Sequence, residues 1–246
     1  MIQKQAAMCA ILLTVSSAFC GTAFATPLQG TEKAAVSAES ALHVDSSRWN
    51  YDKDNDIYYQ IGLVYCKNPA ASEYESLSVY VPGAYMKGTP NADGTYTCQI
   101  SDKGKVGEYT ARTAPVIIPV NTGGYAAQKA PSSYAPKGLN TYLSQGFVYV
   151  FAGCRGRDNG TNPDGTTFDG GAPWGVTDLK AAVRYLRYND SFLPGNKDRI
   201  FTFGHSGGGA QSALMGATGD SELYRPYLDS IGALMKDDQG RELSDA

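Results

Sequence analysis

One serine of the chain, Ser206, stands in a pattern that can carry nucleophilic catalysis. It lies in GHSGG (204–208), which fits G-x-S-x-G, directly between the apolar run 199–204 and a run of small residues. A serine on a tight strand-to-helix turn needs small neighbours two positions away on either side, because those residues crowd each other. Gly204 and Gly208 meet this need. The pattern predicts a nucleophile elbow, and the alternative is an ordinary glycine-rich turn.

An elbow of this kind also predicts an oxyanion hole. Gly207 opens the following segment, where the backbone N–H groups of a helix N-terminus face a developing negative charge. A second donor is expected from a loop that follows an earlier strand. The segment PVNTGGY (119–125) ends such a strand, and Gly123 and Gly124 would let the backbone approach a substrate. The candidate pocket residues beside these groups are Tyr125 and His205.

A serine nucleophile also needs a histidine base and an acid that orients it. In α/β-hydrolases the chain order is serine, acid, histidine, and no histidine follows Ser206. His205 is adjacent to the serine and its side chain leaves the turn in another direction, whereas His43 lies in a polar segment before the first strand. The acids after the serine fall on the next helix and the tail: Asp220, Asp229, Asp237, Asp238 and Asp245. We therefore expect the acid and the base beyond residue 246, and no hydrolytic turnover by this polypeptide alone.

The elements that would position these residues alternate in type. The segments 57–66 and 77–82 are typical of strands, and turn signals over 83–113 indicate an inserted hairpin. From residue 114 onward continuous apolar runs alternate with helical patterns. Strands are expected at 114–121, 147–153 and 199–204, and helices at 138–146, 174–190, 207–218 and 221–235. The clearest helix has Val176, Leu179, Val183 and Leu186 on one face. This order predicts α/β architecture, with a parallel sheet and helices on its faces.

Four segments together resemble the bacterial tannases and their relatives, which are secreted or cell-associated α/β-hydrolases with feruloyl-esterase-like activity. The segments are APVIIPVNTGGY, GFVYVFAGCRGRD, DLKAAVRYLRYND and GHSGGGAQSALMGATGDSELYRPYLDSIGA. The resemblance runs from about residue 57 to 246. It implies a serine esterase for galloyl or related phenolic esters. It also implies a truncated α/β-hydrolase fold over 51–246, mostly parallel, with helices on both faces and the C-terminal strands and lid missing.

Other functions stay open. A carboxylesterase for cell-wall esters, or a peptidase, could use the same fold, because the lid shapes the acyl pocket. A non-catalytic homologue that binds ligands or partners is a third possibility. The intact serine and its glycines argue against it, since binding alone does not need them.

The first 25 residues predict a cleaved signal peptide. Lys4 precedes an apolar run, and AFA (23–25) has the small residues of a cleavage site. The run is short for a membrane anchor, and a lipoprotein anchor on Cys20 fits poorly because bulky Phe19 precedes it. We expect a secreted, periplasmic or cell-surface protein with no stable membrane insertion after cleavage. Residues 26–50 are interpreted as a polar linker.

The charge of the chain indicates which class of partner it binds. The net charge of −3 and the pI near 5.4 disfavour a nucleic-acid partner, so a small-molecule ester is the expected partner.

After cleavage three cysteines remain, Cys66, Cys98 and Cys154, without metal-ligand spacing. A Cys66–Cys98 bridge is one option in an oxidising compartment. The acid-rich loop 155–173 is expected at the active-site rim. Its spacing is not that of an EF-hand, and its acids are expected to pair with Arg155 or Arg157. We expect no metal and no cofactor.

Overall fold

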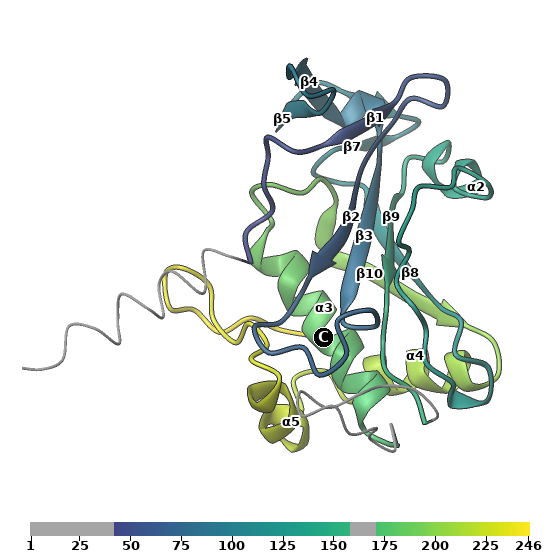
Figure 1. The fold of residues 1–246 in the computed structure, drawn as a ribbon, viewed down its shortest axis with the longest axis vertical. Coiled ribbons are helices and arrows are strands. Elements are labelled where there is room, and N and C mark those ends of the chain that lie inside the picture. The colour runs from purple at the N-terminus through teal and green to yellow at the C-terminus, as the bar shows by residue number, and fades with distance from the viewer. Residues whose placement is uncertain (1–41, 158–170) are drawn as a thin grey trace, which may run out of the picture.

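The computed structural model describes residues 42–157 and 171–246 (Figure 1). The predicted signal peptide, the first part of the predicted linker and most of the loop 155–173 lie outside these residues. Residues 42–50, which the sequence suggested as linker, pack on the domain: Leu42, Val44 and Trp49 are buried. None of the helices in the described part has the length and apolar character of a membrane span.

A mixed six-stranded sheet forms the centre, in the order β1-β2-β3-β9-β8-β10. Its strands are β1 (Asn50–Asp52), β2 (Ile57–Val64), β3 (Ser76–Pro82), β8 (Pro115–Val120), β9 (Val148–Ala152) and β10 (Asn196–Gly204). The pairings from β1 to β9 are antiparallel, whereas β8 pairs parallel with both β9 and β10. The parallel arrangement predicted from residue 114 onward is therefore confirmed. Val120 pairs with Gly204, so the ends of β8 and β10 lie side by side.

The predicted insertion over 83–113 is also present. After a 3₁₀ turn, η1 (Gly83–Tyr85), two small antiparallel ribbons follow one another. The first joins β4 (Met86–Pro90) and β5 (Tyr96–Ile100), and the second joins β6 (Lys105–Val106) and β7 (Tyr109–Thr110). In Figure 1 β4 and β5 lie at the end of the molecule remote from α4.

Helices cover both faces of the sheet. They are α2 (Asn140–Leu143), α3 (Trp174–Tyr188), α4 (Gly207–Ala217) and α5 (Arg225–Ser230), with 3₁₀ turns η2 (Gly123–Tyr125) and η3 (Glu222–Tyr224). Val79 and Val81 share a core cluster with the apolar face of α3, whereas Tyr80 packs with Leu139 and Leu143 near α2. Successive residues of a strand point to opposite faces, so α3 and α2 lie on opposite sides. Figure 1 shows α3, α4 and α5 grouped in the lower half of the view.

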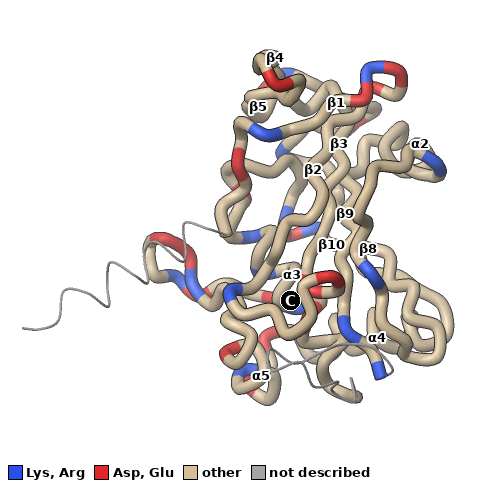
Figure 2. Tube along the Cα trace, viewed as in Figure 1, with Lys and Arg blue, Asp and Glu red and all other residues tan. Residues whose placement is uncertain are grey.

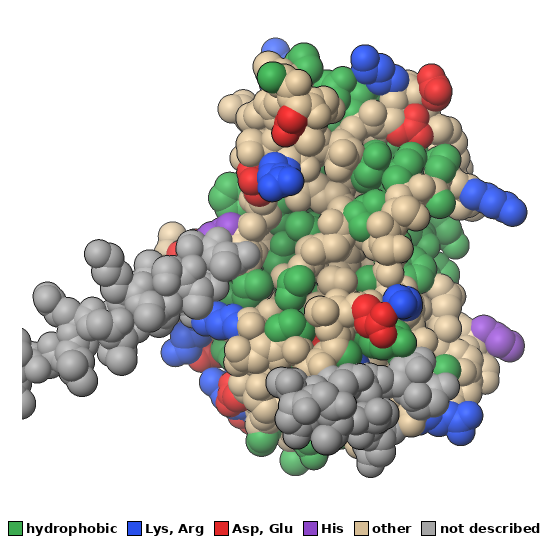
Figure 3. All heavy atoms as spheres, viewed as in Figure 1, with side chains coloured by type: hydrophobic (Ala, Val, Ile, Leu, Met, Phe, Trp, Pro, Cys, Tyr) green, Lys and Arg blue, Asp and Glu red, His purple; other side chains and the backbone are tan. Residues whose placement is uncertain are grey.

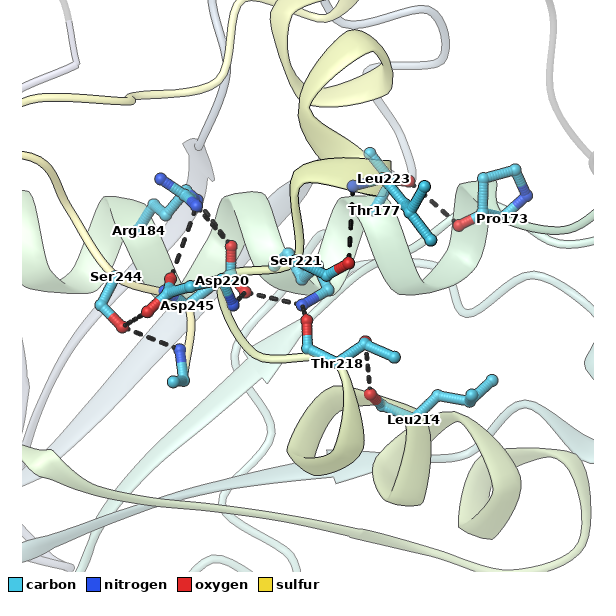
Figure 4. Close-up of polar contacts among 12 residues, drawn as sticks. Pro173, Thr177, Arg184, Leu214, Thr218, Asp220, Ser221, Leu223, Ser244 and Asp245 are labelled. Carbon is cyan, nitrogen blue, oxygen red and sulfur yellow. Dashed lines mark hydrogen bonds and ion pairs between the residues drawn. The ribbon is translucent and has the colours of Figure 1, made fainter.

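The stripe predicted for α3 is confirmed, since Val176, Leu179, Val183 and Leu186 are all buried. Lys180 and Arg184 are buried too, although the pattern places them off the stripe. Lys180 Nζ and Arg184 Nη2 each lie 2.6 Å from the carboxylate of Asp245. Asp245 also accepts the N–H of Asp220 at 2.9 Å (Figure 4). This buried ion cluster fixes the turn after α4 and residues 243–246 on α3.

The strand β10 differs from its prediction. Its apolar run predicts a buried strand, but β10 lies at the edge of the sheet that the described residues form, and Phe201 and Phe203 are 53% and 39% exposed. Both side chains point to the α2 face, where the ring of Phe203 lies 6.0 Å from that of Tyr142. Figure 3 shows hydrophobic side chains reaching the surface over the central strands. Figure 2 shows Lys and Arg interspersed with Asp and Glu along the described chain.

Candidate active site

Ser206 lies on a strained turn between β10 and α4. Its backbone angles are φ 54° and ψ −120°, and a positive φ is costly for a residue with a side chain. The turn closes directly into the helix, because Gly208 N–H donates to His205 O and Ala210 N–H donates to Ser206 O, both at 3.0 Å. Ser206 is exposed. The local geometry is that of the elbow described above for G-x-S-x-G.

The glycines around Ser206 are required by their surroundings. A Cβ on Gly204 would overlap Val120 O and lie 2.6 Å from the carbonyl carbon of Gly208. A Cβ on Gly208 would also overlap Val120 O and lie 2.9 Å from its carbonyl carbon. Both contacts are with backbone, which cannot swing aside as a side chain can. Gly204 and Gly208 therefore let the end of β8 approach the elbow closely.

The loop after β8 meets the elbow at Gly207. A Cβ on this buried glycine would lie 2.7 Å from Tyr125 N and 3.3 Å from Gly124 N. The loop turns sharply here: Tyr125 N–H donates to Thr122 O at 2.9 Å, and Gly124 and Tyr125 both have φ 62°. The structure thus brings the predicted oxyanion segment, Gly123 and Gly124, against the residue that follows the serine. The sequence alone anticipated this meeting.

A cavity of about 380 Å³ opens beside this loop. The residues that line it include Tyr125, Tyr224, Arg157, Gln211 and Leu214. Arg157 Nη2 lies 3.7 Å from the position of a Cβ on Gly124, so the guanidinium of Arg157 lies beside the loop. Of the two predicted pocket residues, Tyr125 lines this cavity; His205 is exposed and is not among its described lining residues.

A larger cavity, of about 610 Å³, lies elsewhere. It surrounds the start of β10 at Asn196, Lys197 and Asp198, which is the opposite end of that strand from Ser206. Its walls carry charges of both signs, from Arg112 and Arg241 as well as Asp190. Its position separates it from the elbow.

His43 is not placed as the base for Ser206. His43 Nε2 lies 3.0 Å from the Tyr188 hydroxyl and 3.4 Å from Asp238. Tyr188 ends α3, whereas Gly175 at its start lies against Gln211 of α4. The stretch of α3 between these two residues spans roughly 20 Å at ~1.5 Å per residue. His43 therefore belongs to the far end of the helix.

Several of the acids that follow Ser206 have structural partners. Asp220 and Asp245 belong to the ion cluster on α3, where Ser244 also donates to Asp220 at 2.6 Å (Figure 4). Asp237 pairs with Arg241 at 2.6 Å, and Tyr188 donates to Asp238 at 2.6 Å. These carboxylates stabilise the C-terminal segment. The structure thus gives them roles apart from orienting a base.

A second buried ion cluster, around Arg155, was not predicted from the sequence. Arg155 Nη2 lies 2.7 Å from Asp178 and 3.4 Å from Glu75, and its guanidinium stacks over Trp174 at 4.2 Å. The acids of its own loop, which the sequence predicts as partners of Arg155 or Arg157, lie outside the described residues. Burial, with the charge of Asp178, raises the pKa of Glu75 to about 7, against the opposing effect of Arg155. The cluster ties the end of β9 to the start of α3, which holds the segment carrying Arg157.

The three described cysteines are free and buried, so the Cys66–Cys98 bridge is not formed. Cys66 lies next to Ala233, whereas Cys98 belongs to the hairpin β4–β5. Burial raises the pKa of the Cys98 and Cys154 thiols to about 12, which makes them poor nucleophiles. In 42–157 and 171–246 no group of three His, Cys, Asp or Glu side chains is arranged to hold a metal ion.

Comparisons with known proteins agree with this architecture. Residues 106–239 match the model of the BD-FAE family. The tannase of Fusobacterium nucleatum has 33% sequence identity and a TM-score of 0.66, over 83% of this chain and 40% of that chain. The native tannin acyl hydrolase of Lactobacillus plantarum has 33% identity and a TM-score of 0.60, over 77% of this chain and 37% of that one. A tannin acyl hydrolase solved with ethyl gallate gives 34% identity and a TM-score of 0.60, over the same shares.

No curated protein sequence matches this chain. The chain spans about two fifths of the length of the tannases to which it is similar. The six-stranded sheet with helices on both faces is consistent with a truncated α/β-hydrolase fold. Since the family match covers more than half of the 246 residues, the chain belongs to the BD-FAE family of feruloyl esterase-like domains, and it is similar in sequence and structure to bacterial tannases.

Proposed function

We propose that the protein is an exported serine ester hydrolase that cleaves galloyl or related phenolic esters, with Ser206 as its nucleophile. One observation carries the proposal: an exposed serine with φ 54° and ψ −120° stands at the junction of β10 and α4. Backbone strain of this size persists only where the surrounding structure enforces it, and it is concentrated at functional sites. Here the backbone of Val120 packs closely against Gly204 and Gly208, on either side of the serine.

The reaction follows from this geometry. Ser206 Oγ attacks the carbonyl carbon of the ester while a base takes its proton. The carbonyl oxygen becomes an oxyanion, which the N–H of Gly207 and an N–H of Gly123 or Gly124 stabilise. The alcohol then leaves with a proton, and water hydrolyses the acyl-enzyme in a second round. Each oxyanion donor of this kind contributes roughly 10²–10³ to the rate.

The base and the acid belong to the same proposal. His43 lies at the far end of α3, and the carboxylates of Asp220, Asp237 and Asp245 have partners of their own. The relatives extend well beyond the length of this chain. We assign the base and the acid to a part of the protein outside residues 1–246, and these residues alone would then show no turnover.

A phenolic acyl group suits the cavity beside the loop. The two tyrosine rings and Leu214 offer apolar contact to an aromatic ring, and Arg157 offers charge-assisted donors to phenolic oxygens. Tannin acyl hydrolases have been solved with ethyl gallate and with 3,4-dihydroxybenzoate, both aryl carboxyl compounds. These similarities support the substrate class.

Hydrolysis of methyl gallate and methyl ferulate by the complete protein tests the proposal. We expect turnover of at least one ester and loss of turnover in Ser206→Ala. Turnover that persists in Ser206→Ala would refute the assignment of the nucleophile. An N-terminus of the exported protein at Thr26 would support export by a cleaved signal peptide, and an intact Met1 in the cell interior would contradict it.

A further inference from the structure

The geometry points to Gln211 as a positioning residue for the oxyanion loop, acting through the side chain of Thr122. This inference rests on the proposed function, because it concerns the donors that would stabilise the oxyanion. Gln211 belongs to α4, five residues after Ser206, and Thr122 lies in the loop that follows β8. Both residues are buried, with relative exposures of 5% and 0%.

One hydrogen bond joins the helix to the loop. The hydroxyl of Thr122 donates to Gln211 Oε1 at 2.5 Å. Gln211 follows Gly207 by four residues, so both lie on the same face of α4. Gly207 meets the backbone of residues 122–125, and Gln211 meets the side chain of Thr122 one turn further along. The loop is therefore fixed to α4 at two points.

The amide of Gln211 has little freedom to move. A Cβ on Gly175, at the start of α3, would overlap Gln211 Nε2 and lie 3.4 Å from its Cδ. The side chain is thus held between α3 and the loop, at the wall of the cavity, and the absence of a side chain at Gly175 makes room for it. An amide held in this way is a suitable fixed point for a loop that must hold its geometry.

Thr122 also restrains the turn that carries the proposed oxyanion donors, the N–H groups of Gly123 and Gly124. Its carbonyl accepts the N–H of Tyr125 at 2.9 Å, which closes the turn that holds Gly124 and Tyr125 at positive φ. A second glutamine secures the residue before it. Gln128 Nε2 donates to Ala152 O at 2.6 Å and to Pro119 O at 3.1 Å, and Gln128 Oε1 accepts the N–H of Asn121 at 2.5 Å. Gln128 thus fixes the base of the loop on the sheet, and Gln211 fixes the turn on the helix.

Two single variants and their combination, made in the complete protein, test this role. Thr122→Val and Gln211→Met each remove the hydrogen bond and keep a similar volume. We expect each to lower kcat about 10- to 100-fold, because the displaced donors act on the transition state. Thr122 is not among the described lining residues of the cavity, so Thr122→Val should change KM less than about 3-fold. The double variant should be no slower than the slower single variant. Thr122→Ser, which keeps the hydroxyl, should restore kcat, and Gln145→Met, at an exposed glutamine, should leave it unchanged.

Multiplicative losses in the double variant, or a Thr122→Ser variant as slow as Thr122→Val, would overturn the inference. A lowered unfolding temperature with wild-type kcat would also overturn it, since the role would then be structural only. The Ser206→Ala variant distinguishes failure of the proposed function from failure of the positioning role. If that variant is inactive while the Thr122 and Gln211 variants have wild-type kcat, only the positioning role is wrong.

Discussion

Gly208→Ala is the substitution that tests most sharply why the elbow needs glycine. The added Cβ would overlap Val120 O and lie 2.9 Å from the Val120 carbonyl carbon and 3.3 Å from Thr122 N. An ordinary contact between such atoms is 3.4 Å or more, and the added Cβ would lie 1.9 Å from Val120 O. The helix α4 and the end of β8 must therefore separate by about 1.5 Å, the difference between these two distances. A displacement of about 1 Å at reacting groups can cost about 10²-fold in rate. We therefore expect kcat to fall about 100-fold.

The cost in stability can be worked out in the same way. Overpacking of a close contact costs about 1–3 kcal/mol, and replacing glycine by alanine in a helix returns about 0.5–1 kcal/mol. The net loss of about 1–2 kcal/mol corresponds to a fall in Tm of about 2–8 °C for a domain of this size. Calorimetry and steady-state kinetics on the complete protein would measure both effects.

Gly216→Ala is the matched control, because it makes the same change in the same helix. Nothing lies within 4 Å of a Cβ at Gly216. We expect wild-type kcat and a gain in unfolding free energy of about 0.5–1 kcal/mol. If Gly208→Ala retained wild-type kcat and Tm, the argument from close approach of β8 to the elbow would be wrong.

Two other predictions concern the buried ion clusters. Asp245→Asn leaves Lys180 and Arg184 buried without their carboxylate. We expect denaturant unfolding to show a loss of about 3 kcal/mol in unfolding free energy. A loss below about 0.5 kcal/mol would contradict the role of the cluster. Burial raises the pKa of Glu75 from its ordinary value of 4.5 to about 7. The folded state therefore binds the extra proton between these pH values, so this group's stabilisation is complete below about pH 4.5 and is lost as the pH rises through 7. Thermal unfolding of Glu75→Gln should show a weaker fall in Tm between pH 5 and 7 than the wild type, and identical slopes would refute the assignment.

The features that local rules dictate could be predicted from the sequence. The positions of Gly204 and Gly208 follow from the crowding on a tight turn, and the stripe of α3 follows from the helical period. The meeting of the Gly123–Gly124 loop with the elbow could also be anticipated. It depends only on two parallel strands ending at the same edge of the sheet.

Features that depend on distant residues could not be predicted. Lys180 and Arg184 look like solvated charges until Asp245, far along the chain, is placed against them. Arg155 and Asp178 are likewise joined only in the fold.

Gln128 and Gln211 left no signal that could have identified them. A glutamine in a loop or on a helix is unremarkable in a sequence, and its function here lies in the bonds to Asn121 and Thr122. Each needed the loop, the sheet and the helix to be in place together.

The central claim is that Ser206 forms an acyl-enzyme. Its most direct test is to quench the complete protein with acid during turnover of a phenolic ester, digest it and weigh the peptides. The proposal predicts the mass of the acyl group on the peptide that contains Ser206, and its absence from Ser206→Ala. An acyl group on another residue would contradict it. Turnover with no acylated peptide, together with an active Ser206→Ala variant, would also contradict it.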